Sequence, residues 1–118
     1  MASVTAKAAC ALIGSYAAAK AGVVSLTQTA AVELRSHNIR VNAILPGFVG
    51  TELVSSHKHE FEQQLGIPDF DAVVAQRQGR YGTPEEVANL AVFLASGRSS
   101  FCNGGAYVLD GGVSSSLL

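Results

Sequence analysis

The sequence predicts an α/β fold in which two parallel strands and two main helices form one end of a larger sheet. Three observations lead to this fold class: a mostly apolar run at residues 40–47, a second at 105–112, and a capped helical segment between them. A strand, a crossover helix and a second strand in this order form a unit whose strands are parallel. Because two parallel strands cannot bury both of their faces and edges by themselves, we expect further strands beside them.

The first long helix is predicted to begin with Ser15 as its N-cap and to run to about Ser36. Asn38 follows as a left-handed terminator. Outside the stripe that is predicted to face the core, alanine is the commonest residue, which lets a neighbouring element approach closely. Five residues at helical spacing predict the stripe that faces the core: Val23, Leu26, Thr27, Ala30 and Leu34.

Both predicted strands are short. The run "RVNAILPG" (40–47) is mostly apolar without alternation, which is typical of a strand buried in a parallel sheet. The run "GAYVLDGG" (105–112) predicts a second strand that ends in a turn at Asp110 and its two following glycines.

The segment "TPEEVANLAVFLASG" (83–97) predicts the clearest helix of the chain. Thr83 is its N-cap, Pro84 takes the first helical position, Glu86 completes a capping box, and Gly97 ends the helix. Its inner face is predicted to consist of Val87, Leu90, Ala91 and Leu94.

Residues 52–82 predict a polar and irregular region. Two short helical patches are expected within it, one at residues 60–65 and one at 70–76 with Asp69 as its cap.

Composition excludes several classes of function. The net charge is −1 and no Lys/Arg cluster occurs, so we expect no nucleic-acid partner. Only 14% of the residues are charged, against about 25% in typical globular chains, so most surfaces are expected to be covered. No run of about 18 apolar residues occurs, so no membrane partner is expected. Cys10 and Cys102 form no C-x-x-C pair, which favours free thiols in the cytoplasm.

Tyr16 and Lys20 form the candidate chemical pair of the sequence. Residues four positions apart share a helix face, so the ammonium group of Lys20 can lie near the phenol of Tyr16. A nearby positive charge favours the phenolate, and the N-terminus of the helix acts in the same direction. The pair can therefore exchange a proton with a substrate, although a surface pair on an ordinary helix has the same spacing.

The sequence disfavours two other kinds of site. His57 and His59 lack acidic or cysteine partners at ligand spacing, so they are interpreted as solvated residues and no metal site is expected. No G-x-S-x-G motif occurs, which disfavours a hydrolase with a nucleophile elbow.

Five motifs in order resemble the C-terminal half of a short-chain dehydrogenase/reductase, a member of the large NAD(P)-dependent family. They are Ser3 placed 13 residues before Tyr16, the stretch "SYAAAKAG", the stretch "NAILPGFVGT", the stretch "GRYGTPEEVANLAVFLAS" and the final "YVLDGG". The resemblance covers nearly the whole chain. It implies the C-terminal part of a Rossmann-like, doubly wound parallel sheet, in a single domain.

The resemblance implies an oxidoreductase that interconverts an alcohol and a ketone or aldehyde. Tyr16 matches the catalytic acid/base of the family. Lys20 matches the lysine that activates the tyrosine and hydrogen-bonds the nicotinamide ribose, and Ser3 matches the serine that orients the substrate.

The resemblance also implies contacts with the cofactor, NAD or NADP. Pro46 and Gly47 match the turn where the backbone passes close to the nicotinamide. Val49 and Thr51 match positions that hydrogen-bond the carboxamide, Val49 through its backbone and Thr51 through its hydroxyl. Residues 48–82 are expected to form the substrate lid, with Phe48, Phe61 and Phe70 as apolar candidates.

The sequence departs from the family pattern before Ser3. Only Met1 and Ala2 precede it, so no glycine-rich turn for the pyrophosphate is present. We expect these 118 residues alone to have little or no activity, and the alternative function is a truncated, non-catalytic fragment or interaction module. The resemblance further implies a homo-oligomer, in which the alanine-rich helix starting near Tyr16 packs against a second subunit.

Overall fold

The computed structural model describes residues 1–115. Four α-helices and two strands follow in the order α1 (Gly14–Glu33), β1 (Ala43–Pro46), α2 (Glu52–Leu65), α3 (Phe70–Gln78), α4 (Pro84–Ala95) and β2 (Ala106–Leu109). Three short 3-10 helices lie at Val4–Ala6, Arg35–His37 and Gly97–Ser99. None of the described helices combines the length and apolar character needed to cross a bilayer.

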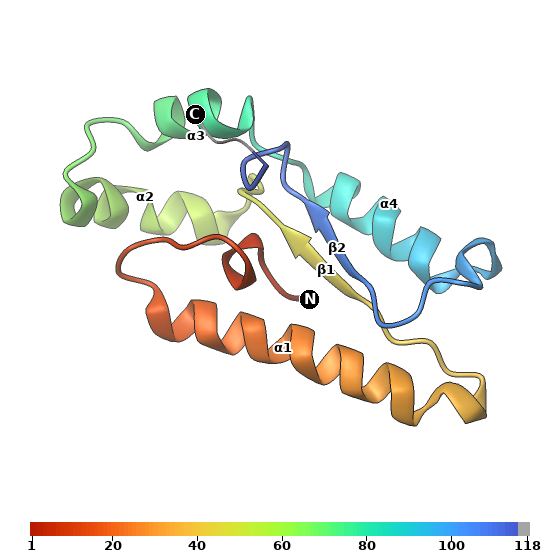
Figure 1. The fold of residues 1–118 in the computed structure, drawn as a ribbon. Helices are drawn as coiled ribbons and strands as arrows, with labels where there is room; N and C mark the ends of the chain where they lie inside the picture. Colours follow the sequence, from red (N-terminus) through yellow and green to blue (C-terminus); the bar gives the residue numbers. More distant parts are fainter. Residues whose placement is uncertain (116–118) are drawn as a thin grey trace.

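The two strands are parallel and pair from Ala43 with Ala106 to Pro46 with Leu109, which confirms the predicted strand–helix–strand unit. The strand pair lies between α1 and α4, and α2 and α3 lie beyond the carboxyl ends of the strands (Figure 1). The predicted lid region therefore stands where the strands end.

The first residues of the chain occupy the edge of β1 that faces away from β2. The Ala43 N–H donates to the Gly105 oxygen, just before β2, at 2.8 Å, and the Gly47 N–H donates to the Leu109 oxygen in β2 at 3.0 Å. The backbone groups of Ile44, the residue after Ala43, point to the opposite edge of β1, where its oxygen accepts from the Ala2 N–H at 2.9 Å. Residues before Val4 thus extend the sheet by one hydrogen bond.

The centre of the core is small. Ala2, Ala43 and Leu45 form its buried cluster, and Leu45 is completely inaccessible to solvent. Four half-buried residues pack around this cluster: Ala6, Val23, Val24 and Ala106. Small side chains let α1 and the first residues approach the strands closely.

The boundaries of α1 correct the predicted ones. The helix begins at Gly14 with Ile13 as its N-cap, so Ser15 lies inside the first turn and does not cap it. It ends at Glu33, and Ser36 lies in the following 3-10 turn. Asn38 has φ 58°, which confirms the left-handed terminator.

The predicted core-facing stripe of α1 was wrong at one position. Leu26 is 70% exposed, whereas Ala31, outside the prediction, is buried together with Thr27. The cause is that apolar residues occur on all sides of this helix, so their spacing does not define a single stripe.

Residues 52–82 are more helical than predicted. The patch expected at residues 60–65 is the last part of the 14-residue helix α2. Its half-buried positions are Val54, Lys58, Phe61, Glu62 and Leu65, which have helical spacing, but the lysine and the glutamate among them interrupt the apolar pattern. The Asp69 cap is confirmed, because its carboxylate accepts from the N–H groups of Asp71 and Ala72 at 2.9 and 3.1 Å.

The capping box of α4 is present as predicted. Thr83 accepts from the Glu86 N–H at 3.2 Å, and the Glu86 carboxylate accepts from the Thr83 N–H at 2.8 Å. The hydrogen bonds from Arg80 and from Thr83 lower the pKa of Glu86 to about 2. The helix ends at Ala95, two residues before the predicted Gly97, which instead starts a 3-10 turn.

Candidate active site

Tyr16 and Lys20 lie together in the N-terminal part of α1. The Lys20 Nζ is 5.4 Å from the centre of the Tyr16 ring, which is the range of a cation–π contact. The same Nζ donates to the Met1 carbonyl oxygen at 3.4 Å. The ammonium group therefore contacts the aromatic ring and the first residue of the chain at the same time.

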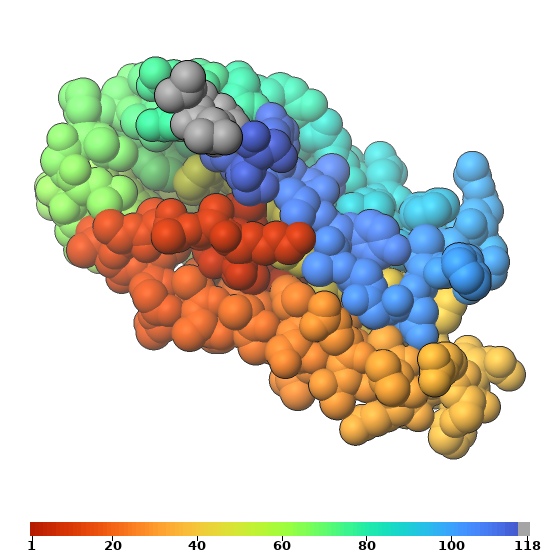
Figure 2. Space-filling view, in the orientation of Figure 1, coloured from red at the N-terminus to blue at the C-terminus, as the bar shows by residue number. Residues whose placement is uncertain are grey.

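Ser3 is buried next to these contacts. Its hydroxyl oxygen accepts from the Thr5 N–H at 3.2 Å and caps the 3-10 turn Val4–Ala6, which packs against α1. A serine hydroxyl also has one donor, and within residues 1–115 the Ser3 O–H donates to no protein group. Figure 2 shows the first residues (red) between α1 (orange) and the helices α2 and α3 (green). The fold thus brings Lys20 to the first residues of the chain, which include Ser3, and the half-exposed Tyr16 ring lies beside Lys20.

Pro46 and Gly47 lie at the carboxyl end of β1. A Cβ atom added to Gly47 would stand 2.5 Å from the Gln78 Oε1 and 2.9 Å from the Asp110 Cα. The packing of the chain itself therefore requires glycine here. The resemblance to the family had explained this glycine by the close approach of the nicotinamide.

Val49 forms an isolated parallel bridge with Gly82. Gly82 accepts from the Gly50 N–H at 2.9 Å and donates to the Phe48 oxygen at 3.0 Å. In such a bridge the N–H and C=O groups of Val49 itself point away from Gly82. Neither group has a backbone partner in the part of the chain that the structure describes.

Thr51 is the N-cap residue of α2, but its hydroxyl makes no capping hydrogen bond. The side chain is exposed and lines a hollow of about 360 Å³. The Asp71 carboxylate in this hollow accepts from the Lys58 ammonium and from the Tyr81 hydroxyl. Burial and the hydrogen bond to Asp71 raise the pKa of Tyr81 to about 12.

The site residues thus fall into two groups. Ser3, Tyr16 and Lys20 belong to one, and Val49 and Thr51 follow Pro46 and Gly47 in the loop after β1. No hydrogen bond joins Val49 or Thr51 to Tyr16 or Lys20 within residues 1–115.

Gln78 is a polar residue of this region that sequence reasoning missed. It is the last residue of α3 and only 7% exposed. Its Oε1 accepts from the Phe48 N–H, and its Nε2 donates to the oxygens of Phe48 and Arg80, each at 2.8 Å. The helical spacing of Phe70, Val74 and Gln78 indicates a buried position, but no pattern in the sequence indicates its partners.

Asp110 is a second buried polar residue at this edge. As predicted, it forms the turn after β2: its carboxylate accepts from the N–H groups of Gly112 and Ser114, each at 2.9 Å. Burial raises the pKa of Asp110, but the hydrogen bonds from Ser114 and Gly112 outweigh burial and leave the pKa below its ordinary value.

The two histidines that were considered for a metal make local contacts. His57 Nδ1 lies 2.9 Å from the Leu53 oxygen, and His59 Nδ1 lies 3.0 Å from a Glu62 carboxylate oxygen. Residues 1–115 contain no group of three or more His, Cys, Asp or Glu arranged to hold a metal ion. Both cysteines have free thiols, as predicted.

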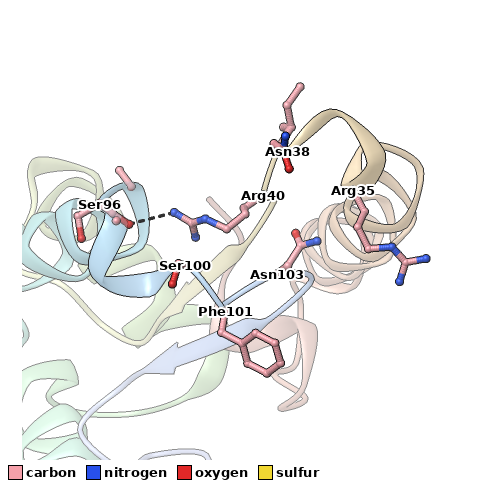
Figure 3. A pocket seen from close by; sticks show the side chains of 10 residues that line it. Arg35, Asn38, Arg40, Ser96, Ser100, Phe101 and Asn103 are labelled. Carbon is pink, nitrogen blue, oxygen red and sulfur yellow. Dashed lines mark hydrogen bonds between the residues drawn. The ribbon is translucent and has the colours of Figure 1, made fainter.

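A separate hollow of about 600 Å³ lies near the amino ends of the strands (Figure 3). None of the predicted site residues lines it. Its Arg40 guanidinium already donates to the oxygens of Leu94, Ser96 and Cys102 at 2.8, 3.1 and 3.0 Å. Arg40 therefore ties the end of α4 to β1, which is a structural role.

Comparisons with known proteins agree with this architecture. A family model described as enoyl-(acyl carrier protein) reductase matches residues 1–114. The 3-oxoacyl-[acyl-carrier-protein] reductase FabG of Chlamydia pneumoniae is 41% identical over 115 residues, which are 96% of this chain and 43% of that protein. The chain spans about two fifths of the length of the curated relatives it matches.

Two solved structures have the same fold over 98% of this chain. An actinorhodin polyketide ketoreductase with NADPH superposes with a TM-score of 0.90 at 29% identity, and the match covers 46% of that chain. A 4-hydroxyisoleucine dehydrogenase complexed with NADH superposes with a TM-score of 0.78 at 28% identity, and the match covers 44% of that chain. The chain belongs to the short-chain dehydrogenase/reductase family and corresponds to its C-terminal portion. The predicted family and fold class are confirmed.

The crowding at Gly47 yields a prediction. We expect Gly47→Ala to lower the free energy of unfolding by about 1–3 kcal/mol, because the new methyl group overlaps Gln78 and Asp110. Gly50→Ala is the control, since its Cβ would stand 3.8 Å from its nearest neighbours. Urea unfolding followed by circular dichroism measures both, and equal losses would contradict the packing described for Gly47.

Proposed function

We propose that this chain carries the nicotinamide end of the active site of an NAD(P)-dependent oxidoreductase that interconverts an alcohol and a ketone or aldehyde. The observation that carries the proposal is the position of the Lys20 ammonium, 5.4 Å from the centre of the Tyr16 ring and hydrogen-bonded to Met1. Membership of the short-chain dehydrogenase/reductase family supports the same assignment.

In the proposed reduction, the Tyr16 hydroxyl gives its proton to the carbonyl oxygen of the substrate. The hydride for the carbonyl carbon would come from NADH or NADPH when it is bound. The Lys20 ammonium, 5.4 Å from the centre of the Tyr16 ring, stabilises the phenolate that Tyr16 becomes, because opposite charges attract. In the reverse direction the phenolate accepts the proton of the alcohol.

Ser3 is proposed to hold the substrate oxygen. Its O–H has no protein acceptor within residues 1–115, whereas its oxygen is fixed by the Thr5 N–H. The hydroxyl can therefore donate to the same substrate oxygen that takes the proton from Tyr16.

The loop after β1 is proposed to bind the carboxamide of the nicotinamide. The backbone N–H and C=O of Val49 are free of backbone partners in the described chain, and the Thr51 hydroxyl is not used for capping. A carboxamide has both donors and an acceptor, which these groups complement. Pro46 and Gly47 would set the start of this loop beneath the ring.

We also propose that residues 1–118 form the C-terminal half of one domain and that residues 48–82 cover the substrate. Phe48, Phe61 and Phe70 support this, since their rings pack together, with centres 5.2 Å apart for Phe48–Phe70 and 5.6 Å for Phe61–Phe70. The outer side of α1 carries Leu26 and Val32, 70% and 66% exposed, which supports a homo-oligomer. Sedimentation at rising protein concentration measures that association.

A second candidate function applies to a polypeptide that consists of these 118 residues alone: a non-catalytic interaction module. It is supported by the length of the match, about two fifths of the relatives. We expect such a polypeptide to show negligible oxidation of a panel of secondary alcohols with NAD or NADP. Absorbance at the wavelength of the reduced nicotinamide measures this, and robust turnover would contradict the second candidate.

The oxidoreductase proposal is tested by joining this chain to the portion of a relative that lies outside the match. In a chimera, residues 1–115 replace the matched part of the Chlamydia pneumoniae reductase. We expect Tyr16→Phe to lower its kcat for ketone reduction by about 10²–10⁴-fold, because the proton donor is lost.

The control is Tyr107→Phe, which removes a phenol hydroxyl from β2 and leaves α1 untouched. Its kcat should stay close to that of the parent chimera. A Tyr16→Phe chimera that turns over as fast as the Tyr107→Phe chimera would refute the role of Tyr16.

A further inference from the structure

Gln78 uses all of the hydrogen-bonding groups of its side chain inside the fold. The Oε1 accepts one N–H, and the two hydrogens of Nε2 go to two different carbonyl oxygens. Two of these three bonds are to the backbone of a single residue, Phe48. The amide therefore pairs with Phe48 as the backbone of a neighbouring strand would.

The environment of Gln78 leaves little room for movement. On one side is Gly47, where an added Cβ would meet the Gln78 Oε1 at 2.5 Å. On the other is Gly111, where an added Cβ would meet the backbone oxygen and the Cγ of Gln78 at 2.7 and 2.8 Å. Gly111 also has φ 60°, a conformation that favours glycine. Two glycines are thus required at the points where the chain touches Gln78.

The bonds from Gln78 fix the segment that leads to Val49 and Thr51. Phe48 is bound on its N–H by Gln78, and its oxygen accepts from both Gln78 and Gly82. With both backbone groups of Phe48 held, rotation of the peptide units on either side is restricted. The Val49 N–H shares a peptide unit with the Phe48 oxygen, so its direction follows from this restriction, whereas the next peptide unit is held by the bond from the Gly50 N–H to the Gly82 oxygen.

We propose that Gln78 is a positioning residue for the loop 47–51. It acts through the backbone of Phe48 and touches neither cofactor nor substrate. The nicotinamide part of this inference rests on the proposed function, whereas the effect on the loop does not.

An apolar side chain at this position keeps the packing and removes the hydrogen bonds. Gln78→Met is the suitable variant, because methionine has a similar length and adapts to irregular space. The Phe48 N–H would then lose its acceptor, while the bond from Gly82 to the Phe48 oxygen would remain. The expected result is a fold that is retained with a loop that is loosened.

The first experiment measures amide hydrogen exchange by NMR in the whole chain. In Gln78→Met we expect the Phe48 amide to exchange about tenfold faster or more, while the amides of Ala43 and Leu45 in β1 keep their protection. Gln76→Met is the matched control, an exposed glutamine of the same helix, and it should leave Phe48 unchanged. Equal exchange of Phe48 in the wild type and Gln78→Met overturns the inference.

A second variant keeps the test valid if Gln78→Met fails to fold. Gln78→Glu has the same size, and its carboxylate accepts from the Phe48 N–H but donates to neither carbonyl. Its Phe48 amide should stay protected. The Phe48 oxygen, however, loses the hydrogen bond from residue 78, so the following residues are held less firmly and the Gly50 amide should exchange faster than in the wild type. A Gly50 amide as protected as in the wild type overturns the inference.

The second experiment separates this inference from the proposed function. Nicotinamide mononucleotide is titrated into the wild type and both variants, and the shifts of the Gly50 and Thr51 amides give the Kd. We expect the Kd to rise about tenfold in Gln78→Met and to stay unchanged in Gln76→Met. Binding that is equal in the wild type and Gln78→Met overturns the positioning role and leaves the proposed function standing. If the wild type binds no mononucleotide, the proposed cofactor contact of the loop 47–51 fails, and the exchange experiment alone decides the role of Gln78.

Discussion

The arrangement of the site depends on the hydrogen bond from the Ala2 N–H to the Ile44 oxygen, 2.9 Å long, on the edge of β1 that β2 leaves open. This bond holds the first residues against the strand. Lys20, on the helix α1, donates to the Met1 oxygen at 3.4 Å. The first residues thereby lie between a strand edge and the helix that carries Tyr16 and Lys20. A change that releases this segment would separate Ser3 from the pair without altering α1.

The other half of the site is set by crowding at the carboxyl end of β1. Gly47 faces Gln78 and Asp110, and both are buried polar residues whose hydrogen bonds are made within this region. Such polar groups cost free energy when buried unless they are paired, so their pairing fixes one conformation of the loop. The rigid start of the loop contrasts with its exposed end at Thr51, where a hydroxyl is left available.

Sequence reasoning predicted the elements whose signals are local. The capping box at Thr83 and Glu86, the Asp69 cap, the Asn38 terminator and both strands are present as expected. It failed where tertiary contacts decide. The exposure of Leu26 was not predicted, because apolar residues occur on all sides of α1 and their spacing does not show which side is buried. The length of α2 was not predicted, because the half-buried Lys58 interrupts its apolar pattern. The contacts of Gln78 join residues 30 positions apart, and no local pattern encodes them.

The central claim is that the charge of Lys20 and the phenol of Tyr16 act as one unit. A double-mutant cycle on kcat, with Tyr16→Phe, Lys20→Met and both together in the chimeric reductase, tests it most directly. We predict strongly non-additive losses, in which the double variant loses far less than the product of the two single losses, because Lys20 has no phenolate to stabilise once the Tyr16 hydroxyl is removed. Losses that multiply would show that the two residues act independently and would contradict the account.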